Sequence, residues 1–222
     1  MKKIITIVIV VLAALGFGYF LFKISPQQNL NSANPPFDLT KAVKLDKPLA
    51  VTAEDHVMGN AQAKNTFIVY EDFECPACAT FAGTVEQVPS KFTDTKVVFR
   101  HFPLFQIHSL AIQASLAAEA AEAQGKFWEM YNQLYTNQNN WNTLADPTNE
   151  FVKLAGAAGV ADLVQFKSDL QSQKYKSVIE KNYLEGVGLS IQGTPTVYFN
   201  DKQLELGDIN SLMSQAQALY LK

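Results

Sequence analysis

Two cysteines constrain the fold of this chain more than any other feature of its sequence. Cys75 and Cys78 are the only cysteines among 222 residues, and they lie three positions apart. A scaffold held by disulfides needs more cysteines, spread along the sequence, so this fold must be held together by side-chain packing. The composition allows such packing, because 48% of the residues are hydrophobic and 18% are charged, as in globular domains.

The charge balance argues against nucleic acid as a partner. The chain has 18 Lys and Arg residues against 21 Asp and Glu residues, which gives a formal net charge of −3. Binding to nucleic acid requires a surplus of basic side chains that neutralise phosphates. We therefore expect no nucleic-acid partner.

An apolar run near the N-terminus predicts a membrane anchor. Residues Ile4–Phe22 carry no charge and follow Met1-Lys2-Lys3. A helix of this length spans roughly 28 Å, close to the hydrocarbon thickness of a bilayer. The lysines ahead of the run place residues 1–3 in the cytoplasm and the rest of the chain outside. The lack of a small-x-small cleavage site favours an uncleaved transmembrane helix over a cleaved signal peptide, and both alternatives export the domain that follows.

The remaining sequence divides into a linker and one domain. Residues 23–48 are rich in Asn, Gln, Ser and Pro and predict a spacer. Within residues 49–222, strand-type and helix-type patterns alternate. Strands are predicted at 67–70, 96–102, 196–199 and 203–206, and helices at 75–92, 109–124, 127–135, 149–158, 162–189 and about 208–220. This order indicates an α/β fold with a helical insertion over about 105–190.

The segment Cys75-Pro76-Ala77-Cys78 carries the chemistry. A cysteine at the N-cap with Pro76 at the first helical position suits a helix start, because the N–H that proline lacks would have no partner there. The free N–H groups and the positive end of the helix dipole favour a thiolate at Cys75. A lowered thiol pKa makes Cys75 a nucleophile and a good leaving group. Cys78 lies one turn further, on the apolar face, where it can resolve a mixed disulfide.

The same motif is compatible with two different chemical roles. It could form half of a zinc site, but zinc needs four ligands, and the only additional candidates are His56, His101 and His108. It could form a purely structural disulfide, although so short a loop contributes little stability. We favour the redox interpretation and expect neither a metal nor an organic cofactor.

Four segments resemble DsbA-like thioredoxin domains. They are Asp55–Gly59 continuing through Glu71–Cys78, Arg100–Leu104, Gly125–Tyr131 and Gly193–Thr196. Each segment alone is weak, but all four occur in the order of the family, over about residues 50–220. The resemblance implies a thioredoxin-like fold with an inserted helical subdomain.

The resemblance also implies roles for individual residues. Cys75 would exchange with the partner's sulfur and Cys78 would resolve, with Pro76 and Ala77 completing this part of the active site. Pro195 would be cis and lie against the two sulfurs. Thr194 would offer backbone groups to an extended substrate segment. Alternatively, Gly-Thr-Pro-Thr could be a simple turn before a strand.

Two departures from the family pattern concern residues near the cysteines. The strongest oxidants have a histidine where this chain has Ala77, which supplies no charge to a thiolate. Many members have an acidic residue six positions before the first cysteine, where this chain has Val69. Glu71 lies on the same side of the strand by alternation and could replace it, although we favour Glu71 and Asp72 as ordinary polar residues at a strand end.

The other notable side chains are given structural roles. We predict that His101 lies at a strand end, that His108 precedes a helix, and that the two tryptophans pack inside the domain. Glu119 and Glu122 are interpreted as the solvated face of a helix. None of these residues is predicted to take part in catalysis.

The favoured function is donation of a disulfide to newly exported proteins by a protein thiol–disulfide oxidoreductase anchored outside the cytoplasmic membrane. A membrane thiol oxidase linked to quinone would then reoxidise Cys75 and Cys78. One alternative is reduction or isomerisation of incorrect disulfides. Another is a tethered chaperone or adaptor that binds unfolded segments without turnover.

Overall fold

The computed structural model describes residues 35–92 and 94–220. The predicted anchor at 4–22, residues 1–3 and the first part of the predicted linker lie outside the described residues. Within the described part of the chain, none of the helices combines the length and the apolar character needed to cross a bilayer.

A five-stranded mixed sheet forms the centre of the domain, in the order β1-β3-β2-β4-β5. The central strands β2 and β3 run parallel, and the other neighbouring pairs are antiparallel. Every residue of β2 is buried, which requires cover on both faces of the sheet. The strand bounds are β1 His56–Met58, β2 Asn65–Glu71, β3 Thr95–His101, β4 Thr196–Phe199 and β5 Lys202–Leu204.

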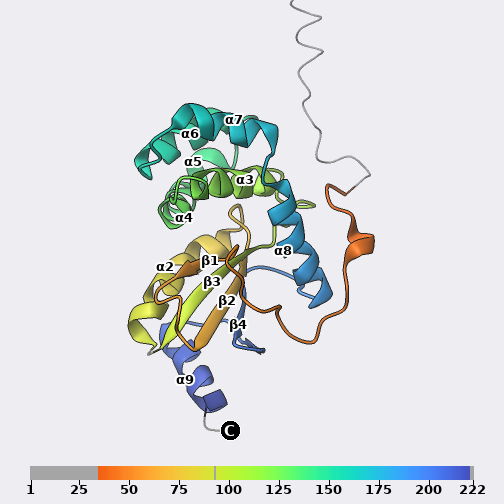
Figure 1. Ribbon diagram of the computed structural model, residues 1–222, viewed down its shortest axis with the longest axis vertical. Coiled ribbons are helices and arrows are strands. Elements are labelled where there is room, and N and C mark those ends of the chain that lie inside the picture. Colours follow the sequence, from red (N-terminus) through yellow and green to blue (C-terminus); the bar gives the residue numbers. More distant parts are fainter. Residues whose placement is uncertain (1–34, 93, 221–222) are drawn as a thin grey trace, which may run out of the picture. The chain divides into compact units, whose positions relative to one another are not determined.

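Helices surround this sheet, and most of them come from one insertion between β3 and β4. Figure 1 shows α3 to α7 gathered as a block beyond one end of the sheet, with α2 and α8 at its two sides. The α/β fold with a helical insertion is therefore confirmed. The helix bounds are η1 Leu39–Lys41, α2 Pro76–Lys91, α3 Ala111–Glu122, α4 Phe127–Thr136, α5 Gln138–Trp141, α6 Thr148–Ala157, α7 Leu163–Ser172, α8 Lys176–Gly188 and α9 Ile209–Tyr220.

Helix α2 packs on the sheet through the face that the sequence pattern predicts. Cys78, Phe81, Val85 and Val88 are buried at spacings of three and four residues, the period of one side of a helix. Because Cys78 begins this buried stripe, the packing that fixes α2 also fixes the position of its thiol.

The single helix predicted over 162–189 is wrong. The structure has α7 and α8 instead, separated at Gln173, whose φ is 53°. A left-handed residue after the last turn ends a helix, and it is usually glycine. The sequence has glutamine at this position, so the pattern gave no signal of the break.

The predicted spacer is attached to the domain from Phe37 onward. The Phe37 ring is buried, with its centroid 5.6 Å from Phe105 and 5.1 Å from Tyr183. Further along, the Leu45 N–H donates to the Gly188 carbonyl at 2.9 Å. Residue 188 must be glycine, because a Cβ there would collide with the backbone of this segment. The interpretation of 35–48 as a free spacer therefore missed its packing against α8.

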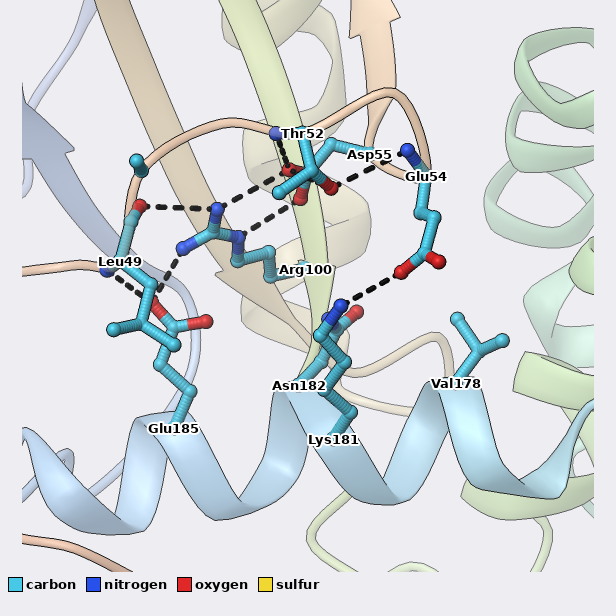
Figure 2. Close-up of a pocket in the computed structure, with 10 residues that line it drawn as sticks. Leu49, Thr52, Glu54, Asp55, Arg100, Val178, Lys181, Asn182 and Glu185 are labelled. Atoms are coloured by element: carbon cyan, nitrogen blue, oxygen red, sulfur yellow. Dashed lines mark hydrogen bonds and ion pairs between the residues drawn. The ribbon is translucent and has the colours of Figure 1, made fainter.

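Arg100 links the same segment to the sheet and α8. Figure 2 shows its guanidinium between Asp55 and Glu185, to which it donates hydrogen bonds, with a third acceptor in the Leu49 carbonyl. The small cavity beside it has a volume of about 70 Å³, and its lining contains neither cysteine nor the Thr194–Pro195 loop. Since the charge of Arg100 is paired on both sides, we interpret this junction as structural.

Candidate active site

Cys75 occupies the N-cap of α2 and Pro76 its first position, as predicted. Both cysteines are free thiols. Cys78 is completely buried and Cys75 is 6% exposed, whereas Pro76 and Ala77 between them are exposed. Only Cys75 therefore lies close enough to the surface to meet the sulfur of another protein.

The loop before β4 completes the site. The Thr194–Pro195 peptide bond is cis, which confirms what the family resemblance implied. Cys75 Sγ lies 3.4 Å from the Thr194 carbonyl oxygen, to which it donates a hydrogen bond when protonated. The fold thus brings Cys75, Cys78, Thr194 and Pro195 together from segments more than a hundred residues apart.

The surroundings of the two thiols shift their pKa values in opposite directions. The hydrogen bond from the Cys78 thiol is the largest influence on Cys75. Together with the Thr194 side chain and the N–H groups of Cys78 and Ala77, it lowers the Cys75 pKa to about 5 despite burial. Burial raises the pKa of Cys78 well above its usual value. At neutral pH, Cys75 is the thiolate and Cys78 keeps its proton.

A buried carboxyl group lies behind the cysteines. Glu71, the last residue of β2, is completely buried. Its Oε2 accepts a hydrogen bond from the Tyr131 hydroxyl at 3.0 Å, and burial raises its pKa to about 8. When Glu71 is ionised, its charge raises the pKa of Cys78, in addition to the larger effect of burial. Glu71 does lie at the strand end, as the favoured interpretation predicted, but its side chain is completely buried. The alternative that it replaces the acid absent at Val69 stays a prediction, and the burial of its carboxyl group is consistent with it.

Asp72 organises the turn that leads into α2. Its carboxylate is buried and accepts hydrogen bonds from the N–H groups of Glu74 and Leu104 and from Nδ1 of His108. Its own carbonyl accepts the Cys75 N–H at 3.1 Å. The turn before the cysteine is therefore fixed to the loop that follows β3.

His108 is a member of this site that the sequence did not reveal. Its imidazole is 2.7 Å from the Asp72 carboxylate and 17% exposed. The hydrogen bond to Asp72 raises the pKa of His108, and the nearby charges of Asp72, Glu74 and Cys75 raise it further. When protonated, His108 would bring a positive charge near Cys75, which the side chain of Ala77 cannot do. No motif surrounds His108 in the sequence, since its position depends on a turn between β3 and α3.

A second cluster of ionisable groups lies between the sheet and the insertion. Nε2 of His56 and Nε2 of His101 lie 2.6 Å and 2.7 Å from the same oxygen of Glu119. Burial opposes ionisation of Glu119, but the hydrogen bonds from the two histidines lower its pKa to about 2. Because Glu119 is only 4% exposed, its assignment to a solvated face is wrong.

The cluster is hydrogen-bonded rather than arranged for a metal ion. Its three candidate ligand atoms lie within 4.8 Å of one another. Two ligands of one zinc ion, each about 2.0–2.1 Å from the metal, would lie more than about 3 Å apart in a tetrahedral site, and both nitrogens here are closer than that to the oxygen. The histidines also give no support to a zinc site at Cys75 and Cys78, because all three pair with carboxylates instead.

The arrangement of strands, helices and cysteines agrees with a family comparison. The family described as Thioredoxin matches residues 51–216, most of the chain, and the protein therefore belongs to this family. The observed fold is accordingly a thioredoxin-like domain with a helical insertion between β3 and β4.

Several solved structures share this fold. Oxidised BdbD from Bacillus subtilis superimposes with a TM-score of 0.70 and 22% identity, over 82% of this chain and 99% of that one. DsbA from Chlamydia trachomatis gives a TM-score of 0.66 and 16% identity, over 78% and 94% of the two chains. A thioredoxin-like oxidoreductase from Silicibacter pomeroyi gives 0.65 and 19%, over 77% and 95%. At these identities the similarity establishes the fold.

Curated relatives carry a different name. Na(+)/H(+) antiporter NhaA 1 from Mycolicibacterium gilvum is 33% identical over 195 residues, which are 86% of this chain but 29% of that protein. NhaA 1 from Salinispora arenicola is 34% identical over 155 residues, which are 67% of this chain and 22% of that protein. The chain thus spans less than a third of these relatives, and their exchange of ions is not carried over to it.

Proposed function

We propose that this protein is a thiol–disulfide oxidoreductase that introduces disulfides into exported proteins. The observation that carries the proposal is the asymmetry of the two thiols. Cys75 lies near the surface at a helix start with its pKa lowered to about 5, and Cys78 is buried behind it. Low thiol pKa and partial access are the properties of a cysteine that reacts with other proteins.

The reaction needs two exchange steps. A substrate thiolate attacks Cys75 Sγ of the oxidised protein, so a mixed disulfide forms, the Cys75–Cys78 bond breaks, and Cys78 takes up a proton. A second substrate thiolate then attacks the substrate sulfur of the mixed disulfide, and Cys75 leaves as a thiolate. The substrate has lost two electrons, and Cys75 and Cys78 have gained them.

The stabilised Cys75 thiolate favours donation of disulfides over their reduction. A group that stabilises the dithiol form makes the disulfide a stronger oxidant. Thr194, in the loop before β4, would offer its backbone groups to a substrate segment, as in strand addition. Reduction or isomerisation is the alternative, and it requires a more reducing cysteine pair.

We place the domain outside the cytoplasmic membrane, with Ile4–Phe22 as the anchor. The support is the length and apolar character of that run. For turnover, a quinone-linked membrane thiol oxidase would reoxidise the dithiol. The non-catalytic chaperone or adaptor is less favoured, because binding alone would not require an acidic thiol beside a resolving one.

The decisive measurement is the reduction potential of the Cys75–Cys78 pair against glutathione, together with oxidation of a reduced model protein. We expect a potential more positive than about −200 mV, above that of glutaredoxins, and stoichiometric oxidation by the oxidised protein. The Cys75→Ser, Cys78→Ser double variant is the control for binding without exchange. A potential near −270 mV, typical of thioredoxin, would indicate a reductase, and no exchange at all would indicate an adaptor.

A further inference from the structure

The thiol proton of Cys78 has no direct contact with solvent. When reduced Cys78 attacks a mixed disulfide on Cys75, it must first lose its proton, and it is fully shielded from solvent. Burial and neighbouring groups hold that proton firmly. A group inside the domain must therefore accept it. Because this attack is a step of thiol–disulfide exchange, the identity of the acceptor rests on the proposed function.

Glu71 is the first acceptor that the structure offers, but it cannot act alone. Its Oε2 is occupied by the Tyr131 hydroxyl, and burial keeps the carboxyl group protonated at neutral pH. A protonated acid can take the proton of Cys78 only if it releases its own at the same time. Its second oxygen, Oε1, is buried and has no hydrogen-bond partner in the part of the chain that the structure describes.

A second buried atom without a hydrogen-bond partner among the described residues, Nδ1 of His101, lies on the neighbouring strand β3. His101 is the in-register partner of Glu71 in the parallel β2–β3 pair, so the two side chains project from the same face of strands about 4.8 Å apart. The Phe73 ring supports this placement, with its centroid 5.9 Å from Tyr131 and 6.0 Å from His101.

The protonation states of Glu71 Oε1 and His101 Nδ1 are complementary. Nε2 of His101 lies 2.7 Å from Glu119, whose pKa is lowered to about 2, so Nε2 carries the hydrogen and Nδ1 is a bare acceptor. Oε1 of a protonated Glu71 is a donor. The two atoms are not hydrogen-bonded to each other, so a proton passing from one to the other would cross a bridging water molecule.

We propose that His101, held by Glu119, accepts the proton that leaves Cys78 through Glu71. As the Cys78 sulfur bonds to Cys75 Sγ, the bond from Cys75 to the substrate sulfur breaks and the substrate leaves as a thiolate. The Cys78 proton moves to Glu71, and the Glu71 proton moves to Nδ1 of His101. The resulting imidazolium is paired with the Glu119 carboxylate. In this scheme His101 accepts the proton, and Glu119 positions His101.

The charges around the pair are consistent with this transfer. Glu71 faces Tyr131 and Tyr135 from α4 and Cys75 from α2. His101 faces Glu119 from α3, His56 from β1 and Asp72 from the end of β2. Burial and His56 lower the pKa of His101, whereas Glu119 and Asp72 raise it. The imidazole is therefore neutral at rest, and its charged form has a carboxylate at hydrogen-bond distance.

A kinetic test separates this inference from the proposed function. Reduced protein is mixed with oxidised glutathione at concentrations where the rate of disulfide formation no longer rises, so that the attack by Cys78 limits the rate. Glu119→Gln keeps the size and the hydrogen-bond acceptor but loses the charge. We expect it to slow this rate at least tenfold and to increase the solvent deuterium isotope effect, with the equilibrium constant against glutathione changed less than twofold. Glu129→Gln, an exposed carboxylate paired with Lys126, is the matched control and should behave as wild type.

Each outcome supports or overturns the role of His101. If wild type exchanges disulfides and Glu119→Gln resolves at the wild-type rate, the role of His101 is refuted and the proposed function stands. If wild type does not exchange at all, the proposed function fails. Should Glu119→Gln not fold, ¹⁵N spectra of the wild-type imidazoles decide instead. We expect a hydrogen on Nε2 and none on Nδ1 of His101 in the dithiol form, and a hydrogen on Nδ1 would overturn the inference.

Discussion

The replacement Glu71→Gln tests whether a buried, uncharged acid lies behind the cysteines. Glutamine has the same shape and can still accept the hydrogen bond from Tyr131, but it cannot ionise. Burial raises the pKa of Glu71 from 4.5 to about 8. A pKa that is higher in the folded than in the unfolded state contributes stability that is fully present below pH 4.5 and is lost as the pH rises through about 8.

The size of the effect follows from the same values. Each pKa unit corresponds to about 1.36 kcal/mol, so ionising Glu71 in the folded domain costs about 5 kcal/mol more than in the unfolded chain, with water penetration making this an upper bound. The stability of the variant relative to wild type should therefore increase by up to that amount between pH 4.5 and 8.5. Cys75 also titrates in this range. Because it does so in both proteins, its contribution cancels to first order when the stability of wild type is subtracted from that of the variant.

Urea unfolding of the two reduced proteins at four or five pH values measures this difference, provided that both show the same dependence on urea concentration. The exposed Glu205 allows a matched control, because Glu205→Gln makes the same chemical change at the surface. Its stability should follow that of wild type at every pH. If the Glu71→Gln curve also runs parallel to wild type, Glu71 is ionised at neutral pH and the reasoning about the Cys78 proton fails.

Three further predictions concern the thiols and their location. His108→Gln removes the charge beside Asp72 and should raise the Cys75 pKa by up to about one unit, seen as a shift in the thiolate absorbance titration; an unchanged titration would show that the imidazole is too distant to matter. Cys78→Ser should trap mixed disulfides of Cys75 with exported proteins in cells, and the absence of adducts that disappear on reduction would contradict its resolving role. A membrane-impermeant thiol reagent should label Cys75 in intact cells after mild reduction, and labelling only after lysis would place the domain inside.

The sequence predicted those parts of the site that depend on short-range chemistry. Cys75 and Pro76 form a helix start wherever a helix follows them, because capping depends on a few neighbouring residues. The cis bond before Pro195 did not follow from propensity, since few such bonds are cis, and it was found through resemblance. Most of the order of strands and helices was likewise predicted from periodicity, but the short elements β1, α5 and η1 and the break at Gln173 were missed.

The remaining parts of the site depend on pairs that are distant in sequence. Glu119 lies in an alanine-rich helix and looks solvated until His56 and His101 are placed against it from two strands. The same holds for His108, which gains its role only through Asp72. A periodic pattern indicates which face of an element is buried, but it does not indicate which polar side chain across the core will satisfy a buried charge. This is why Glu119 was assigned to a solvated face. His101 and His108 do lie where the sequence predicted, at a strand end and before a helix, but their carboxylate partners were not predicted.

The structure also accounts for how a motif without histidine can hold an acidic cysteine. In this protein the low pKa of Cys75 depends mainly on the Cys78 thiol, the Thr194 side chain and the N–H groups at the start of α2, none of which involves the side chain at position 77. The raised pKa of His108 favours its charged form, which would add a positive charge from outside the motif. The residues between the cysteines are exposed and remain free to contact a partner. Activation of the thiol and recognition of the partner are therefore carried by different residues, so replacing Ala77 should alter partner selection more than the reactivity of Cys75.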